Sequence, residues 1–477
     1  MNRLVSITLF TVLVCNFLSA QNKQILYDFN EIPQSLMVNP GVESDFKWYF
    51  GVPFISGISG YLGINGVSVN DIFAEDGLDI NDKVRDRMVN GMVPRNEFSG
   101  NVQMELLNIG FRSSNPNIFY SGGAYLEFDN ITYWPRDYAQ LIFDGNADQL
   151  DRKFDLGDLK TRGSLVTVYH LGINKKVDKN LTIGARGKIY SGIMDYNSTR
   201  NSGYLLNTEG QNNILNTTLS ADLELRTSGF GQLDDASENG TVSNTLVKRA
   251  LFGGDLGLGL DLGFSYRVNE QTVFTASVLD LGFIYHGGDT QNYSLAGTAN
   301  SEGIQINVLR ELSNLNRDYW QDLVDEIEEL IPFQETNNGY LTFRPTKVNA
   351  SLRYDFGKPL GSSEDCDCTT DPSGSNEPRM AYRNSVGGHL FLINRPRDSQ
   401  AAITGFYMRR FGNIMALKAT YTADKFSFTN IGFGLNLQAD PVNLYAIADN
   451  LLSYRNIAAS NYASFQLGLN IISWGNK

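Results

Sequence analysis

The sequence has few cysteines, little basic charge and no long apolar run after its first residues. Only three cysteines occur in 477 residues, so the chain is not a disulfide-stabilised scaffold. Thirty-nine basic against 52 acidic residues give a formal net charge of -13. This balance argues against a nucleic-acid partner, because proteins that bind nucleic acids carry a basic surface. Beyond residue 20, no stretch approaches the ~18 consecutive apolar residues that indicate a spanning helix.

Residues 1–20 have the features of a cleaved secretory signal peptide. Arg3 supplies the positive charge, residues 4–18 are mostly apolar, and small residues lead up to a cleavage site after Ala20. A membrane anchor is disfavoured because the apolar run is too short, and lipidation at Cys15 is disfavoured because a branched residue precedes it. We therefore predict that the mature chain is exported.

A strict period of two in apolar residues is the strongest positive signal. Within residues 256–265, five apolar side chains alternate with glycine, aspartate and serine. Similar alternation recurs over residues 181–189, 430–437 and 463–471. Such a pattern places one strand face in an apolar medium and the other against small polar groups.

The length of these segments favours a membrane over a soluble β-protein. They run for about 10–15 residues, whereas soluble strands average about five to six and tilted spanning strands need about 9–11. The 12% aromatic content and the 46 glycines fit interfacial girdles and crowded barrel strands. A propeller is the alternative, but no blade-length repeat occurs. We predict an all-β fold, a transmembrane antiparallel outer-membrane β-barrel of about 14–16 strands with short helices in its long loops.

Sixteen segments are candidate strands. They are residues 47–57, 100–113, 117–128, 163–175, 179–195, 200–207, 213–227, 252–267, 271–285, 341–356, 380–394, 400–411, 414–423, 427–438, 441–449 and 462–474. Short connections occur at five places, near residues 115, 177–178, 269–270, 412–413 and 439–440. Counting strands puts all five on one side of the barrel, which is the periplasmic side because barrels have their short turns there.

This strand assignment divides the chain into a leader, an N-terminal segment and a barrel. We predict a signal peptide at 1–20, a periplasmic or lumenal segment at 21–46 and the barrel at 47–477. Its long loops are 58–99, 129–162, 228–251 and 286–340, with a polar, cysteine-containing insert at 357–377. Apolar residues at helical spacing predict loop helices over 79–89 and 317–331.

Three cations and two cysteines are the candidate functional residues. The alternation predicts that Arg186, Lys188 and Lys418 face the lumen, where charges tune selectivity in an open pore or form ion pairs in a filled one. Cys366 and Cys368 form a candidate redox pair. Two sulfurs one residue apart do not complete a zinc site, so we predict no metal.

No residue pattern points to catalysis. The three histidines, His170, His286 and His389, lie far apart, and no nucleophile elbow, phosphate-binding loop or zinc-protease motif occurs. The glycines of 253–263 lack dinucleotide-binding spacing. We predict no catalytic residues, no cofactor and no enzyme activity. A hydrolase inside the barrel is the least favoured alternative.

Several short motifs resemble an uncharacterised family of Bacteroidota outer-membrane barrels. They are the opening Asn39-Pro40-Gly41, the segment Gly51-Val-Pro53-Phe-Ile-Ser-Gly57, Lys188-Ile-Tyr-Ser191-Gly192, Asp261-Leu-Gly263-x-x-Tyr266, Leu281-Gly-Phe-Ile284 and Asp449-Asn450-Leu451-Leu452. That family is distantly similar to the PorP/SprF barrels of type IX secretion and gliding, and to FadL-like transporters. The resemblance implies an outer-membrane location.

Two functions follow as hypotheses. The first is a non-enzymatic envelope or surface component, associated with type IX secretion or gliding machinery, whose loops bind other envelope proteins. The insert 357–377 and the loop helices motivate it. The second is a FadL-like or porin-like channel for small solutes, motivated by the barrel width and the lumenal cations. Both have outer-membrane lipid as a partner and neither involves nucleic acid.

Overall fold

The structure is a computed structural model. It describes residues 24–474, apart from 67, 93–94, 147, 211–214, 303–330, 332, 361–380, 425–429, 452–453 and 455–459. The predicted signal peptide, both candidate redox cysteines, nearly all of the predicted helix at 317–331 and most of the insert at 357–377 lie outside these residues.

Twenty strands form one continuous antiparallel sheet. Their bounds are β1 Phe46–Gly51, β2 Ile58–Ile64, β3 Arg95–Arg112, β4 Ile118–Pro135, β5 Lys153–Asp155, β6 Lys160–Lys176, β7 Leu181–Glu209, β8 Leu215–Ser228, β9 Asp255–Arg267, β10 Thr272–His286, β11 Thr290–Glu302, β12 Gln334–Thr336, β13 Tyr340–Phe343, β14 Lys347–Leu360, β15 Ala381–Asn394, β16 Ser399–Phe411, β17 Met415–Ala423, β18 Asn430–Ala439, β19 Val442–Asp449 and β20 Tyr462–Trp474. The helices are α2 Ser35–Val38, α3 Val69–Phe73, α4 Ile80–Lys83, α5 Arg136–Phe143, α6 Phe230–Glu238 and α7 Val242–Lys248, with π-helices η1 Val84–Val89 and η3 Arg249–Gly253.

The sheet closes into a barrel of 14 strands, within the predicted range. The last strand, β20, pairs with both β1 and β2, and these two pair in turn with β3, so they count as one interrupted strand. β13 and β14 both pair with β10 and likewise share one position. Closure pairs both edges of the barrel itself, which is the condition for a sheet in a membrane.

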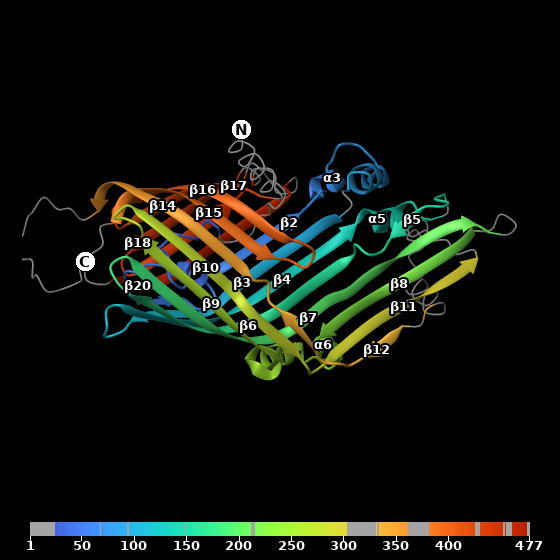
Figure 1. The fold of residues 1–477 in the computed structure, drawn as a ribbon, viewed down its shortest axis with the longest axis horizontal. Helices are drawn as coiled ribbons and strands as arrows, with labels where there is room; N and C mark the ends of the chain where they lie inside the picture. The colour runs from blue at the N-terminus through green and yellow to red at the C-terminus, as the bar shows by residue number, and fades with distance from the viewer. Residues whose placement is uncertain are drawn as a thin grey trace, which may run out of the picture.

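One strand extends far beyond the barrel. β7 is 29 residues long; its first part pairs with β9, and its second part pairs with β8. β8 pairs with β11, and β11 with β12, so a branch of the sheet extends from the barrel wall on one side (Figure 1). We refer to this branch as the extension. Register shifts near Val166 and Arg200 allow β7 to continue through the change of neighbours.

The extension explains where the strand predictions differ from the structure. Residues 200–207 are not a separate strand but the upper part of β7, and residues 213–227 belong to the extension as β8. The predicted loop 286–340 contains a full strand, β11, and the predicted loop 58–99 begins with β2. β11 has only one large aliphatic residue, Leu295, so it lacks the long alternation by which barrel strands are recognised.

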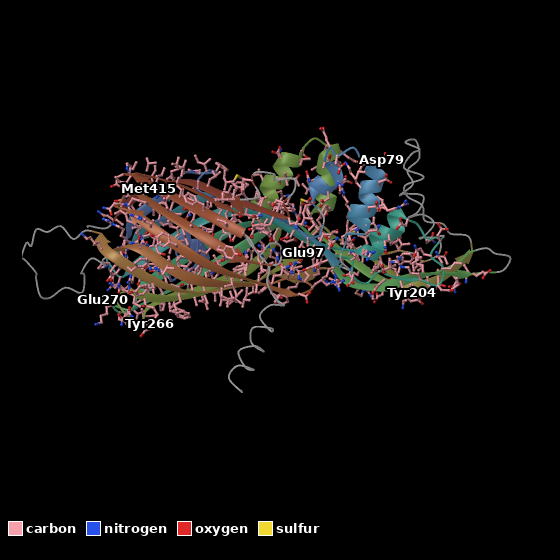
Figure 2. All side chains as sticks on the ribbon, turned by 90° about the horizontal axis from the view of Figure 1, so that it is seen from above. Asp79, Glu97, Tyr204, Tyr266, Glu270 and Met415 are labelled. Carbon is pink, nitrogen blue, oxygen red and sulfur yellow. The ribbon has the colours of Figure 1, made fainter. Side chains whose placement is uncertain are left out.

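The five short connections lie at one end of the barrel, as the strand count predicted. They are the turns β3–β4, β6–β7, β9–β10, β16–β17 and β18–β19, which we call the short-turn end. Figure 2 shows Glu270 and Met415 at this end, while Tyr204 of the extension lies at the other, the long-loop end.

The outer surface is apolar where the alternation predicted it. On β9, Leu256, Leu258, Leu260 and Leu262 are 40–59% exposed, while Asp261 and Ser265 are buried inside. The same division holds on β20, where Phe465 and Leu467 point outward. An apolar exterior around a polar interior is the arrangement of a transmembrane barrel.

Apart from α2, which lies inside the barrel, the helices lie outside this wall. Among the described residues, no helix combines the length and the apolar character needed to cross a membrane. The predicted helix at 79–89 is present as α4 and η1, joined to α3. Lys83 and Arg87 each lie 2.6 Å from Asp76, and the hydrogen bond from Lys83 lowers the pKa of that carboxyl.

Candidate functional site

Residues 24–45, which we call the plug, occupy the barrel lumen near the short-turn end. Their apolar side chains Ile25, Leu26, Phe29 and Ile32 are at most 2% exposed. They pack against inward side chains of the wall, namely Met408, Ala416, Tyr445 and Ile447. A barrel of about 14 strands is too wide for strand side chains alone to fill, so a separate segment completes this core.

Wall side chains bind the plug mainly through its backbone carbonyls. Arg186 donates to the carbonyl of Leu36, and Lys418 donates to that of Tyr27. Asn174 Nδ2 donates to the carbonyls of Pro40 and Val42, at 2.8 Å each. Buried carbonyls without a partner would be costly, and these bonds satisfy carbonyls of a segment whose only regular secondary structure is the short helix α2.

Acidic plug residues pair with arginines of the wall. Glu43 lies 2.5 Å from Arg267, and Glu31 pairs with Arg410. Asp28 accepts a hydrogen bond of 3.2 Å from Thr275. The plug is thus held by many polar contacts around its circumference, each of which can be exchanged for water.

The interruption between β1 and β2 makes a further plug contact. Phe54 has a positive φ of 66°, and the chain there leaves the strand path, so the predicted strand 47–57 ends early at Gly51. The carbonyl of Ser56 turns into the lumen and accepts a 2.8 Å hydrogen bond from Gln34. Gln34 also donates to Glu105 and Asn470. The motif at 51–57 therefore builds a docking point for the plug.

The motif Asn39-Pro40-Gly41 marks where the plug touches the wall most closely. A Cβ added to Gly184 would lie 1.9 Å from the Pro40 carbonyl oxygen, and one added to Gly41 would lie 2.3 Å from the Gly263 carbonyl oxygen. Only glycine allows this approach of two backbones. These glycines fit the plug to β7 and β9.

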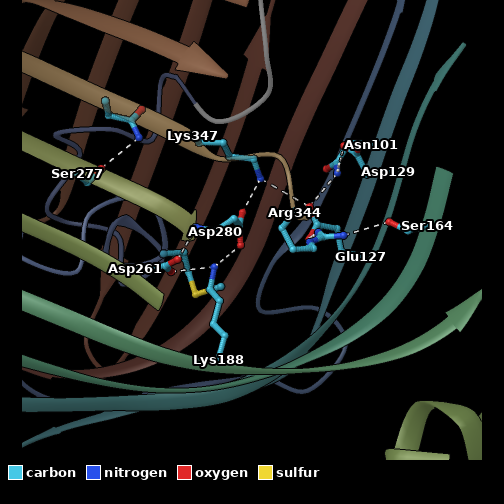
Figure 3. Close-up of polar contacts among 12 residues, drawn as sticks. Asn101, Glu127, Asp129, Ser164, Lys188, Asp261, Ser277, Asp280, Arg344 and Lys347 are labelled. Carbon is cyan, nitrogen blue, oxygen red and sulfur yellow. Dashed lines mark hydrogen bonds and ion pairs between the residues drawn. The ribbon is translucent and has the colours of Figure 1, made fainter. Parts of the chain in front are cut away.

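A network of buried ion pairs lies beyond the plug, toward the long-loop end (Figure 3). Lys188 on β7 contacts Asp261 at 2.8 Å and Asp280 at 2.6 Å. Lys347 on β14 contacts Asp280 at 3.0 Å. Asp280 itself has a φ of 59° at a bulge in β10, which re-aims its side chain. Each charge has a partner of opposite sign, as burial demands.

Some of these ion pairs cross the lumen between strands that are not neighbours. Arg344, between β13 and β14, lies 2.7 Å from Glu127 on β4. Arg395, between β15 and β16, lies 2.6 Å from Asp129 on β4. Neither β14 nor β15 pairs with β4. We call this set, with Lys188, Lys347 and Asp280, the ion-pair layer.

A small cavity of about 50 Å³ lies where plug and layer meet. Plug residues Gln24, Met37 and Val38 line one part, and charged residues of the ion-pair layer line another. The Nε2 atom of Gln24 is buried without a hydrogen-bond partner. A polar cavity of this size has room for a few water molecules, which would satisfy that donor.

The three predicted cations all lie inside the barrel, at 1–5% exposure. Arg186 binds the plug and also lies 3.4 Å from Asp261, which Lys188 of the ion-pair layer contacts at 2.8 Å. The structure therefore brings Arg186 and Lys188 together at one carboxylate, whereas Lys418 binds the plug at a different point, the carbonyl of Tyr27. Spacing could not assign these roles, because their partners are far away in sequence.

Two of the three histidines resemble parts of catalytic arrangements only superficially. His286 contacts Thr342 through Nε2 and Asp255 through Nδ1, at 2.9 Å each. Thr342 is 5% exposed, and Asp255 also contacts Arg249 and Ser228. His389 stacks on Tyr27 of the plug. Among the described residues, no cluster of His, Cys, Asp and Glu side chains is arranged to hold a metal ion.

Sequence reasoning missed the acidic members of the ion-pair layer and the docking residues of the plug. Glu127 and Asp129 follow the inward parity of β4, which is a detectable signal. Glu105 likewise follows the inward parity of β3. Gln34 and Ser56 give no such signal, because their meeting depends on a broken strand and an irregular segment.

Residues 40–449 match the family described as "Family of unknown function (DUF5723)". No curated protein matches the sequence. A Pseudomonas aeruginosa FadL homologue is 8% identical with a TM-score of 0.44, covering 96% of this chain and 100% of that one. The P. putida toluene transporter TodX is 10% identical with a TM-score of 0.37, covering 95% and 93%. The Ralstonia pickettii toluene transporter TbuX is 10% identical with a TM-score of 0.38, covering 92% of each chain. TM-scores this low do not support an argument from these structures. The evidence for the barrel is therefore the pairing of its own strands.

Proposed function

We propose that this chain, which belongs to the DUF5723 family, is an outer-membrane channel for small polar solutes that is closed in the structure described here. The observation that carries the proposal is the plug, a segment that fills a wide barrel without belonging to its wall. All barrel strands follow it in sequence, so its departure would break no strand pairing. Because outer-membrane barrels have their short turns on the periplasmic side, we place the short-turn end toward the periplasm.

The contacts of the plug support displacement. Its carbonyls and carboxylates bind wall groups such as Arg186, Asn174 and Arg267, and all of these would be solvated in an open lumen. The net cost of exchanging such hydrogen bonds for water is modest, about 0.5–1.5 kcal/mol each. A lumen lined by charges also favours polar over hydrocarbon solutes, because a hydrocarbon would leave those charges unsolvated.

The ion-pair layer is a second barrier in series with the plug. Glu127 and Asp129 connect β4 to the opposite wall through Arg344 and Arg395. Removing the plug alone therefore leaves a narrowed lumen. Opening both barriers should give the full conductance of the barrel.

Planar-bilayer recording of the refolded chain tests the proposal. Three proteins are compared: the unaltered chain, a deletion of residues 24–45, and that deletion combined with Glu127→Gln and Asp129→Asn. We expect a closed channel, small currents and large stepwise currents, respectively. A combined variant that forms a folded barrel but stays silent overturns the channel proposal.

A disulfide lock tests whether the plug moves in the intact chain. A Cβ at Gly263 would lie 3.2 Å from Cγ of Asn39, so Asn39→Cys with Gly263→Cys brings two sulfurs together. Cys366 and Cys368 are changed to serine to avoid competing disulfides. In a chain that keeps its plug but carries Glu127→Gln and Asp129→Asn, spontaneous displacement of the plug should give brief currents. Oxidation should abolish these currents and reduction should restore them. Currents that are the same before and after oxidation would show that the plug does not move when the channel conducts.

The envelope-component hypothesis, including an association with type IX secretion, stays a prediction. The extension offers such a component a surface beyond the barrel. Affinity purification from detergent-solubilised membranes, with and without β8 and β11, would test it. Loss of a reproducible envelope partner on removing these strands would support this alternative.

A further inference from the structure

The segment α7–η3, residues 242–253, lies on the outside of the barrel wall. Ser191 on β7 alternates with the inward-facing Tyr190 and therefore points outward, yet it is fully buried. Its hydroxyl donates to the carbonyl of Arg249 at 2.6 Å and accepts from the amide of Phe252 at 3.1 Å. η3 therefore covers the outer face of the wall at Ser191. Figure 2 shows the helices of this region beside the barrel rather than over its mouth.

Three further contacts hold η3 in place. Tyr169 on β6 donates to the carbonyl of Ala250 at 2.9 Å, and its ring stacks on Phe252 with centroids 4.4 Å apart. Arg249 is buried and donates to the carbonyl of Ile193 at 2.7 Å. These contacts fix the segment rigidly against β6 and β7.

The fixed segment presents apolar side chains away from the wall. Val247, Leu251 and Phe252 are 57%, 62% and 48% exposed. Phe252 has a φ of 66°, a conformation rare for a bulky residue, so the surrounding contacts impose it. The segment that carries these exposed residues leads directly into β9, whose outward row begins at Leu256 and Leu258.

The height of η3 matches the outer edge of the membrane. Ser191 is ten residues from Leu181, the first residue of β7 after the short turn. At about 3.3 Å per residue and a tilt of about 40°, Ser191 stands about 25 Å above the short-turn end. An apolar barrel band is also about 25 Å tall. The exposed apolar residues of η3 thus continue the lipid-facing surface at its outer rim.

We propose that α7–η3 is an interfacial anchor that inserts Val247, Leu251 and Phe252 into the outer lipid leaflet. The occupant of this surface is lipid, because the patch is continuous with the lipid-facing wall. Exposed Lys248, at the end of α7, suits the head-group region, as cations do in interfacial helices. The inference rests on the membrane placement made in the proposed function, and it does not depend on channel activity.

Spin-label accessibility in phosphatidylcholine–phosphatidylglycerol vesicles tests the anchor. Single cysteines replace Leu251, Leu258 or Asn244 in a chain whose Cys366 and Cys368 are serine. Each is labelled, and collisions with oxygen, which partitions into lipid, are compared with collisions with a water-soluble nickel chelate. Leu258 is the lipid reference on β9, and Asn244, exposed on α7, is the aqueous reference.

We expect the oxygen-to-nickel ratio at 251 to be several-fold above that at 244 and close to that at 258. A ratio at 251 equal to that at 244, with 258 still in lipid, overturns the anchor alone. If 258 also reads as aqueous, the membrane placement of the barrel itself fails. The two failures are therefore distinguishable.

Discussion

The two ends of the lumen are closed in different ways. Near the short-turn end, an irregular segment fills the space, and wall side chains such as Arg186 and Asn174 bind its backbone. Farther along, the wall closes on itself through side-chain pairs such as Arg344 with Glu127. The first closure takes no part in strand pairing, whereas the second consists of charge pairs of the wall itself. One barrel thus combines a filling segment with a closure made by its own strands.

The largest effect should come from breaking the ion-pair layer. Arg344→Ala leaves Glu127 buried without its 2.7 Å partner. Removing one member of a buried pair costs about 3–5 kcal/mol. Thermal unfolding in detergent should show this loss of stability. Arg344→Met combined with Glu127→Leu should recover most of it, and equal losses in both variants would mean that packing matters more than charge.

A smaller effect should follow from crowding the contact between the plug and the wall. Gly184→Ala places a methyl group 1.9 Å from the Pro40 carbonyl oxygen, so the plug must shift. Overpacking of this kind costs about 1–3 kcal/mol. Limited proteolysis should cut within residues 24–45 faster than in the unaltered protein. Gly187→Ala on the same strand is the matched control, because nothing lies within 4 Å of its added Cβ. Equal cleavage of the two variants would contradict the close fit at Gly184.

Removing one charge of the plug should have a milder effect. Glu43→Gln keeps the shape of the side chain but weakens its contacts with Arg267, at 2.5 and 2.9 Å. We expect a loss of about 1 kcal/mol in plug binding, within the range for charged hydrogen bonds at a partly buried site. The measurement is the rate of protease cleavage in the plug. An unchanged rate would show that the apolar core of the plug alone retains it.

The smallest effect should come from an ion pair outside both closures. Arg85 in η1 contacts Asp144 at 3.2 Å, with the arginine side chain 62% exposed. Exposed pairs contribute about 0–1 kcal/mol, so Arg85→Ala should change barrel stability by less than about 0.5 kcal/mol. The same thermal unfolding assay supplies this baseline. A large drop would show that the loop helices brace the barrel.

Much of the wall could be predicted from the sequence, because lipid imposes a period of two on every strand that faces it. The leucine row of β9 and the five short turns illustrate this. The extension could not be predicted in the same way. β8 has the same period of two as a barrel strand, with Leu219, Ala221 and Leu223 on one face, so its sequence predicts a part of the barrel. β11 has only one large aliphatic residue, Leu295, so its sequence predicts a part of a loop. The apolar side chains of both strands pack in one cluster with Ile331.

The sequence by itself determined an antiparallel barrel, the direction of its faces and the inward position of Arg186, Lys188 and Lys418, since alternation is a local property. Only the tertiary structure decided what those cations contact. The carbonyls of Leu36 and Tyr27 lie about 150 and 390 residues away from Arg186 and Lys418. Such contacts leave no periodic trace, because an irregular plug follows no pattern that a strand must match. The closed lumen is therefore a product of chain packing rather than of any local motif.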